Sequence, residues 1–210
     1  FTRVESSGGE VNQNISMRGI ELINTSDVQI NNVNLTNANT TNGTSDDLDI
    51  TASNAAIYMS GVTGASFNNI NINGTADNGI TGINVSNFSL ANSTITQAGN
   101  GAHESGIEFS NLSGNSSITN TDISFSETNS LDILNTDVNL NLTITGSTFR
   151  NTQTVSSGGA DNSNGEGGIQ FRSFSTAAGA PTTNLTIDDN DFLNLRTQAI
   201  QVIGEDDSIV

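Results

Sequence analysis

Cysteine, lysine and tryptophan are missing from this chain of 210 residues, and their absence excludes several classes of function. Without cysteine there can be no disulfide and no thiolate metal site. The basic side chains are five arginines against 22 acidic residues, which gives a net charge of −17. A nucleic acid would repel such a chain, so we expect no nucleic-acid partner. No apolar run approaches the roughly 18 residues that a membrane-spanning helix needs.

The chain is instead rich in small polar residues, with 32 Asn, 26 Ser and 26 Thr. Such a composition is often typical of disorder. Two features favour an ordered fold here. Charged residues make up only 13% of the chain, and the apolar residues recur at fixed offsets.

A first repeated unit has the order small, apolar, polar, apolar, and it occurs seven times at a mean spacing of 30 residues. The alternation predicts a short strand that turns its apolar side chains inward. We expect the apolar second positions to stack in one buried column, which comprises Ile20, Ile57, Ile80, Ile107, Leu131, Ile169 and Ile200.

A second unit, apolar–x–Asn–x–x–apolar, follows each of the first six copies. Its last apolar positions predict a second buried column, which comprises Leu35, Ile72, Ile95, Ile123, Phe149 and Phe192. Its third position holds residue types that tolerate left-handed backbone angles, which predicts a tight bend and a stacked ladder of side chains. The ladder residues are Asn32, Asn69, Asn92, Asn120, Gly146 and Asp189.

Two units in alternating order predict a solenoid, because one repeat buries too little surface to fold alone. The pattern resembles the right-handed parallel β-helix of the pectate-lyase-like superfamily and of bacterial surface proteins, from about Gly19 to Ile203. The resemblance implies an all-β solenoid of about seven coils with three short strands per coil. We expect one domain over residues 1–210, which is a section of a longer helix or a stacking subunit. Long loops are expected at 36–55 and 150–167.

The polar positions of the first unit provide the candidate catalytic residues. In carbohydrate-active members of the resembled superfamily, this strand carries the active site. Glu108 and Asp132 would lie on adjacent coils, about 5 Å apart, which is the carboxyl separation of retaining glycosidases. The same pair could hold Ca²⁺. The alternative is that two solvated acids share one face of an acidic protein.

The chain contains no complete catalytic motif, so we expect it not to be an enzyme. Polygalacturonases, which have the resembled fold, combine Asn-Thr-Asp, Asp-Asp and Gly-His-Gly segments. This chain has Asn135-Thr136-Asp137 and Asp188-Asp189, but its single histidine, His103, precedes both. We interpret the two fragments as chance matches in a chain rich in these residues.

One segment has the alternating oxygen side chains of a weak Ca²⁺ loop, with Asp161, Ser163 and Glu166 as its candidate ligands. No other cofactor is expected. The favoured hypothesis is a non-enzymatic extracellular structural or adhesive β-helix: a stalk, adhesin or filament-forming segment at a cell surface. Its partners would be further copies stacked end to end, neighbouring repeats of the same chain, or surface glycans. The alternative is a module that binds or degrades polysaccharides in a groove along Glu21, Tyr58, Glu108 and Asp132.

Overall fold

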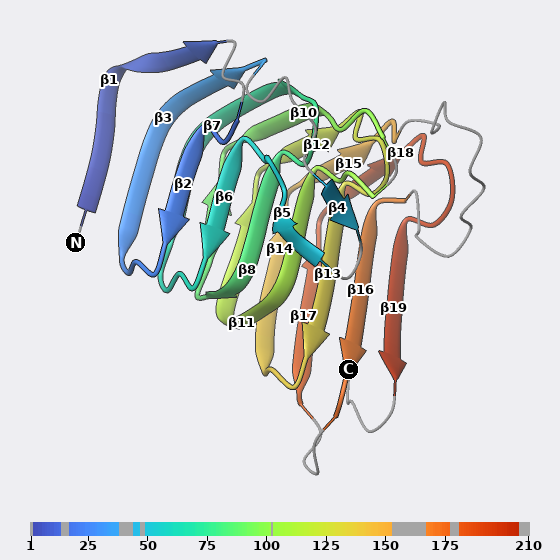
Figure 1. The fold of residues 1–210 in the computed structure, drawn as a ribbon. Helices are drawn as coiled ribbons and strands as arrows, with labels where there is room; N and C mark the ends of the chain where they lie inside the picture. Colours follow the sequence, from blue (N-terminus) through green and yellow to red (C-terminus); the bar gives the residue numbers. More distant parts are fainter. Residues whose placement is uncertain are drawn as a thin grey trace.

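The fold is all-β. The computed structural model describes residues 2–13, 17–37, 44–46, 49–101, 103–152, 167–176 and 181–205. Within these ranges there is no helix, and 17 strands join into one large sheet in which every pairing is parallel (Figure 1). Such stacking of strands that are far apart in sequence is what a solenoid requires.

The strands that start with the first repeated unit form what we call the front row. Each pairs in parallel with the next in chain order, and the seven second-position residues lie opposite one another from Ile20 to Ile200. This register matches the predicted column at every step. The front row comprises β2 (Ile20–Ile23), β6 (Ile57–Ser60), β8 (Ile80–Ser86), β11 (Ile107–Thr119), β13 (Leu131–Thr136), β16 (Ile169–Phe174) and β19 (Ile200–Glu205).

The strands of the second repeated unit form what we call the back rows. The long strand β11 contributes to both the front row and the back rows, because its C-terminal half pairs with back-row strands. The column from Leu35 to Phe192 is in register throughout, as predicted. The remaining strands of the back rows are β1 (Thr2–Gln13), β3 (Val28–Thr36), β7 (Ser66–Thr75), β9 (Ser89–Ala91), β10 (Thr94–Ala98), β12 (Asp122–Ser124), β14 (Leu140–Thr145), β15 (Thr148–Arg150), β17 (Thr183–Asp188) and β18 (Asp191–Leu193).

The hydrophobic core lies between the front and back rows. The columns are fully buried in the middle of the stack, where Ile57, Ile80, Ile107 and Leu131 expose no surface. Each such side chain stabilises the fold by roughly 1.5–3 kcal/mol. Phe67, Phe88 and Phe109 continue the core as a run of ring contacts with centroids 5.9 and 5.0 Å apart. Stacked repeats therefore share one continuous core.

Left-handed residues turn the chain between rows. All six residues of the bend ladder have positive φ, between 48° and 62°. Asn69 Nδ2 donates to Asn32 Oδ1 at 2.8 Å, so the side chains of adjacent repeats bond to one another. The amide ladder is not uniform, because Asn92 Nδ2 donates to Asn68 Oδ1 instead of to Asn69.

Three further bend columns exist that the sequence analysis did not identify. One follows the ends of the back-row strands and holds Asn37, Gly74, Gln97, Phe125, Asn151 and Asn194, all with positive φ. Two others begin at Asn24 and Asp27. Regular left-handed corners are thus a general property of this stack and not of one ladder.

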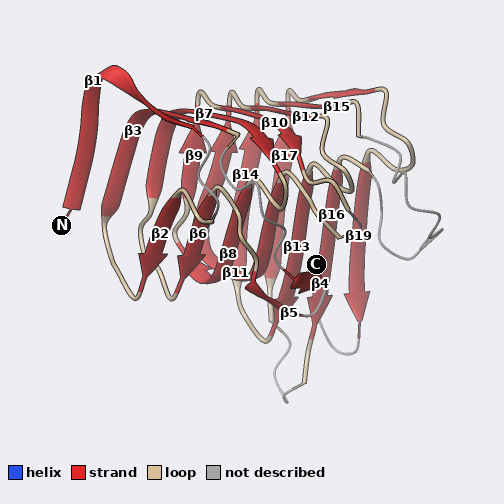
Figure 2. Cartoon of the chain, turned by 45° about the horizontal axis from the view of Figure 1, so that its top comes forward, coloured by secondary structure: helices blue, strands red, loops and turns tan. Residues whose placement is uncertain are grey.

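The expected long loop 36–55 contains a small antiparallel hairpin of β4 (Thr44–Asp46) and β5 (Asp49–Ala52). Figures 1 and 2 both place this hairpin over the front row, and β5 contacts β8. Most of the other expected loop, residues 153–166, lies outside the described residues.

Phe125 is the most unusual residue of the bend columns, and it yields a stability prediction. It has φ 57° and is 40% exposed. A left-handed backbone costs most side chains roughly 1–2 kcal/mol, whereas Asn tolerates it. We expect Phe125→Asn to raise the free energy of unfolding by about 1 kcal/mol, measured by urea denaturation. Phe125→Leu keeps the backbone cost and should bring no gain; equal stability of the two variants would contradict the argument.

Candidate functional site

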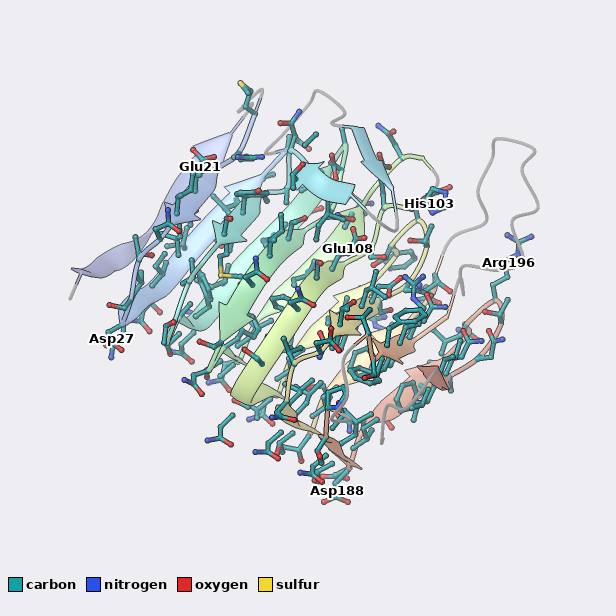
Figure 3. All side chains as sticks on the ribbon, turned by 60° about the horizontal axis from the view of Figure 1, so that its bottom comes forward. Glu21, Asp27, His103, Glu108, Asp188 and Arg196 are labelled. Atoms are coloured by element: carbon teal, nitrogen blue, oxygen red, sulfur yellow. The ribbon has the colours of Figure 1, made fainter. Side chains whose placement is uncertain are left out.

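The polar positions of the front row form one continuous column. Strand pairing places the seven residues opposite one another in this order: Glu21, Tyr58, Thr81, Glu108, Asp132, Gln170 and Gln201. Glu108 and Asp132 are direct register partners on β11 and β13, so the sequence placed the candidate pair on adjacent strands correctly. Figure 3 shows Glu108 over the front row and Asp188 at the opposite edge of the molecule.

The column is covered, which corrects the expectation that its acids face solvent along a groove. Glu108 is 5% exposed, Asp132 4% and Gln170 1%, while Glu21 at one end remains exposed. Several of the chain segments that lead into front-row strands contribute polar side chains that bond to the column. In the middle of the stack the front row is therefore buried on both faces, apolar on one and polar on the other.

At the N-terminal part of the column, the segment that follows β5 closes over β8. Ser53 Oγ donates to Asp77 Oδ1 at 2.9 Å and lies 2.9 Å from Thr81 Oγ1. The backbone N–H of Asn54 donates to Asp77 Oδ2 at 3.0 Å. These bonds join the loop of one repeat to the acid of the next.

Asn78 holds the buried carboxylate of Glu108. Its Nδ2 donates to Glu108 Oε2 and, at 3.1 Å, to Thr81 Oγ1. Its Oδ1 accepts the backbone N–H of Ser105 at 2.6 Å. One amide thus bonds to groups from two successive repeats, as a buried polar residue must.

Asn129 occupies the equivalent position two repeats later, directly before the first unit that contains Leu131. Its Nδ2 donates at 3.1 Å to both Asp132 Oδ2 and Gln170 Oε1, and its Oδ1 accepts the N–H of Gly167 at 2.8 Å. Arg172 Nη2 adds donations to both oxygens of Asp132 at 3.2 and 3.3 Å. Asp132 is therefore a buried, ion-paired acceptor.

The Asn-Thr-Asp fragment has a structural use. Asn135 is fully buried; its Oδ1 accepts the N–H of Leu112 at 2.9 Å and its Nδ2 donates to the carbonyl of Leu112 at 2.8 Å. The Asn135 side chain thus makes the two hydrogen bonds to Leu112 that the backbone of a neighbouring strand would otherwise make. Asp189 of the Asp-Asp fragment is a bend residue of the back rows.

Glu104 is a buried acid that the sequence analysis missed. It lies near Asp77 and Glu127, and all three side chains are buried. Burial raises the pKa of Glu104 to about 7, helped by repulsion from Asp77 and Glu127, although backbone N–H donors at Asn100 and Gly101 lower it. The clue in the sequence is positional: Asn78, Ser105 and Asn129 each stand directly before the small residue of a first unit, and Asp77 and Glu104 precede two of them.

The candidate Ca²⁺ ligands Asp161, Ser163 and Glu166 lie outside the described residues. Within the described ranges, no group of three or more His, Asp or Glu side chains is arranged to hold a metal ion. Those ranges also contain no helix that is long and apolar enough to cross a membrane.

A search of protein-family models, of curated proteins and of solved structures finds no match to this chain. Function must therefore be argued from the geometry of the chain itself.

Arg18 fastens the hairpin segment over Tyr58. The guanidinium lies 3.4 Å from the Tyr58 ring centroid, and Nε and Nη2 donate to the carbonyls of Ser53 and Thr51, each at 2.9 Å. Nη1 also pairs with Glu21. A planar guanidinium suits such combined stacking and forked donation.

This arrangement predicts the effect of removing the guanidinium. Tyr58 is the single tyrosine and there is no tryptophan, so intrinsic fluorescence reports on this contact. We expect Arg18→Gln to weaken closure of the segment by about 1.5–3 kcal/mol, the range for hydrogen bonds to charged groups. Acrylamide quenching of Tyr58 should increase. Arg150→Gln removes an arginine paired with Asp122 in the back rows and should leave quenching unchanged.

The raised pKa of Glu104 predicts that the stability of the fold depends on pH. The pKa of Glu104 is about 7 in the fold, against 4.5 for a solvent-exposed glutamate. Between these values the folded chain keeps a proton that the unfolded chain releases, so stability falls as pH rises, by up to ~1.4 kcal/mol per pH unit. We expect Glu104→Gln to remove this slope in urea denaturation between pH 5 and 8.

Asp188→Asn is the matched control for this experiment, because it removes the same charge from an exposed site in the back rows. The slope should persist in that variant. An unchanged slope in Glu104→Gln would show that another group carries the proton.

Proposed function

We propose that this chain is a non-enzymatic extracellular β-helix with a structural or adhesive role: a stalk, an adhesin or a filament-forming segment of a surface protein. The proposed architecture is a right-handed parallel β-helix of about seven coils, with three short strands per coil, and so about 34 Å long at ~4.8 Å per coil. The observation that carries the proposal is the unbroken register of the front row over all seven strands.

Rigidity is the property that this register supports. Every repeat shares its backbone hydrogen bonds, its apolar column and its buried polar column with the neighbouring repeats. Bending the stack between two repeats would break all three at once. A surface stalk needs this resistance, and the acidic, cysteine-free composition is suited to an extracellular rod.

The state of the candidate acids supports a structural role over a catalytic one. Glu108 accepts a bond from Asn78, and Asp132 is paired with Arg172. A catalytic pair must reach a bound sugar, whereas these two carboxylates lie beneath other side chains. Tyr58, the single tyrosine, is also buried, so its ring cannot stack against a bound sugar.

The proposed partners follow from the edges of the sheet. Among the described residues, β2 pairs in the front row only with β6, and β19 only with β16. Near β19 the apolar side chains become accessible: Ile200 is 41% and Val202 44% exposed. Such edges can accept another parallel coil, from a second copy or from neighbouring repeats of the same chain. Surface glycans are the proposed ligands of an adhesive form.

The test combines imaging with an activity assay on the purified chain. Negative-stain electron microscopy should show stiff rods that are multiples of one coil-stack length. Acidic and neutral polysaccharides should release no reducing ends or unsaturated products. Turnover that disappears in the double variant Glu108→Gln, Asp132→Asn would overturn the proposal in favour of a polysaccharide-degrading enzyme. Ile107→Asp, which places a charge in the buried column, is the control that should abolish the rods.

A further inference from the structure

The turn formed by Gly99, Asn100 and Gly101 wraps around the carboxylate of Glu104. The backbone N–H groups of Asn100 and Gly101 both donate to Glu104 Oε2. Gly99 has φ 86°, and a Cβ there would lie 2.6 Å from the Cβ of Glu104, so the turn approaches the acid more closely than other residues allow. The Asn100 side chain itself is exposed. A carboxylate is thus bonded to the peptide nitrogen that follows an accessible asparagine.

This juxtaposition brings together the parts of a known chemical reaction of asparagine. The peptide nitrogen of the following residue can attack the side-chain amide carbon, and the step is fastest when that residue is glycine, which has no side chain to hinder it. The attacking nitrogen must lose its proton, so a positioned base assists. We propose that Asn100 is a site of self-catalysed deamidation in which Glu104 is the general base.

The proposed steps conserve all atoms. The nitrogen of Gly101 forms a bond to Cγ of Asn100 while its proton passes to Glu104 Oε2. The tetrahedral intermediate then expels the side-chain nitrogen as ammonia, which takes the proton back from Glu104. A five-membered succinimide remains. Water opens this ring at either carbonyl, giving aspartate or isoaspartate at position 100. The sum is asparagine plus water to aspartate plus ammonia, with no oxidant or cofactor.

Glu104 suits this role in strength as well as in position. Burial raises its pKa to about 7, which is close to the value that a general base needs at neutral pH. The charged groups that face it are Asp77 and Glu127 from adjacent repeats, and both favour proton uptake by Glu104. His103 is the neighbouring titratable residue in the chain.

The chain supplies its own comparison sites. Asn78-Gly79 is buried, its side-chain amide is held by three hydrogen bonds, and the N–H of Gly79 donates to the carbonyl of Ser105 at 3.2 Å. Asn73-Gly74 lies inside β7, where Asn73 pairs with Thr96. The first of these peptide units is held by hydrogen bonds directly before β8, and the second lies within β7. Asn100-Gly101 differs from Asn78-Gly79 in that its glycine nitrogen donates to a carboxylate and not to a backbone carbonyl.

The reaction would also alter the turn. An aspartate at position 100 adds a negative charge beside Glu104, Asp77 and Glu127, and isoaspartate lengthens the backbone by one atom. Both products weaken the two N–H donations to Glu104. The turn packs against Glu104 and Glu127, so deamidation at this site would loosen that contact with time. This inference does not depend on the proposed extracellular role.

The test incubates the intact protein at 37 °C in H₂¹⁸O between pH 6 and 8.5. Peptide mapping by mass spectrometry then measures label uptake at Asn100, Asn73 and Asn78. We expect Asn100 to be labelled fastest, as a mixture of aspartate and isoaspartate. Glu104→Gln keeps an acceptor for the two N–H groups but removes the base, and should slow Asn100 by on the order of 100-fold, the lower end for a positioned general base. The rates at Asn73 and Asn78 should not change.

Gly101→Ala provides a second variant that leaves Glu104 intact. A Cβ at position 101 meets Glu104 Oε2 at 3.4 Å, an ordinary contact, so the fold should tolerate it while attack by the nitrogen becomes hindered. Slower labelling at Asn100 in this variant supports the succinimide route. The proposal is overturned if Asn100 stays unlabelled in the wild-type chain, or if Glu104→Gln leaves its rate unchanged while labelling at Asn73 shows an intact fold.

Discussion

The register of the front row is the constraint on which the other features depend. Side chains alternate between the two faces of a strand, so a slip of one residue would exchange the faces. At β11 such a slip would place Glu108 in the apolar core and Ile107 or Phe109 among the buried polar groups. Both exchanges bury unpaired groups at high cost. The two-sided burial therefore fixes the register more firmly than a sheet with one solvated face would.

The polar face of the front row is ordered by amides. Asn78 and Asn129 each present a donor and an acceptor, so one side chain bonds both within its own repeat and to the next repeat. Buried carboxylates such as Glu108 and Asp132 need donors, and these amides together with Arg172 supply them. Asparagine is thus used twice in this fold: at exposed left-handed bends, and inside as a connector between repeats.

The sequence predicted the parts of the fold that repeat. Two columns and one bend ladder came from residues that recur at fixed offsets, and the structure has these residues in register. The covering of the polar column could not be predicted, because it depends on segments such as residues 50–55 and 99–105 that share no common pattern. The positions of Glu104 and Arg18 hold different residue types in most other repeats, so a search for a repeated residue pattern passes over them. Their partners are set by loop geometry, which the strand pattern does not encode.

The bend columns also explain where this chain can vary. A corner position admits residues that accept left-handed angles at low cost, and most corners here hold Asn or Gly. The columns admit only side chains that match their neighbours above and below. Changes in length are therefore found in the segments between strands, including those between the second unit and the next first unit. The Arg18 contacts and the Gly99–Gly101 turn both involve these segments, so these contacts lie between the front-row strands and not within them.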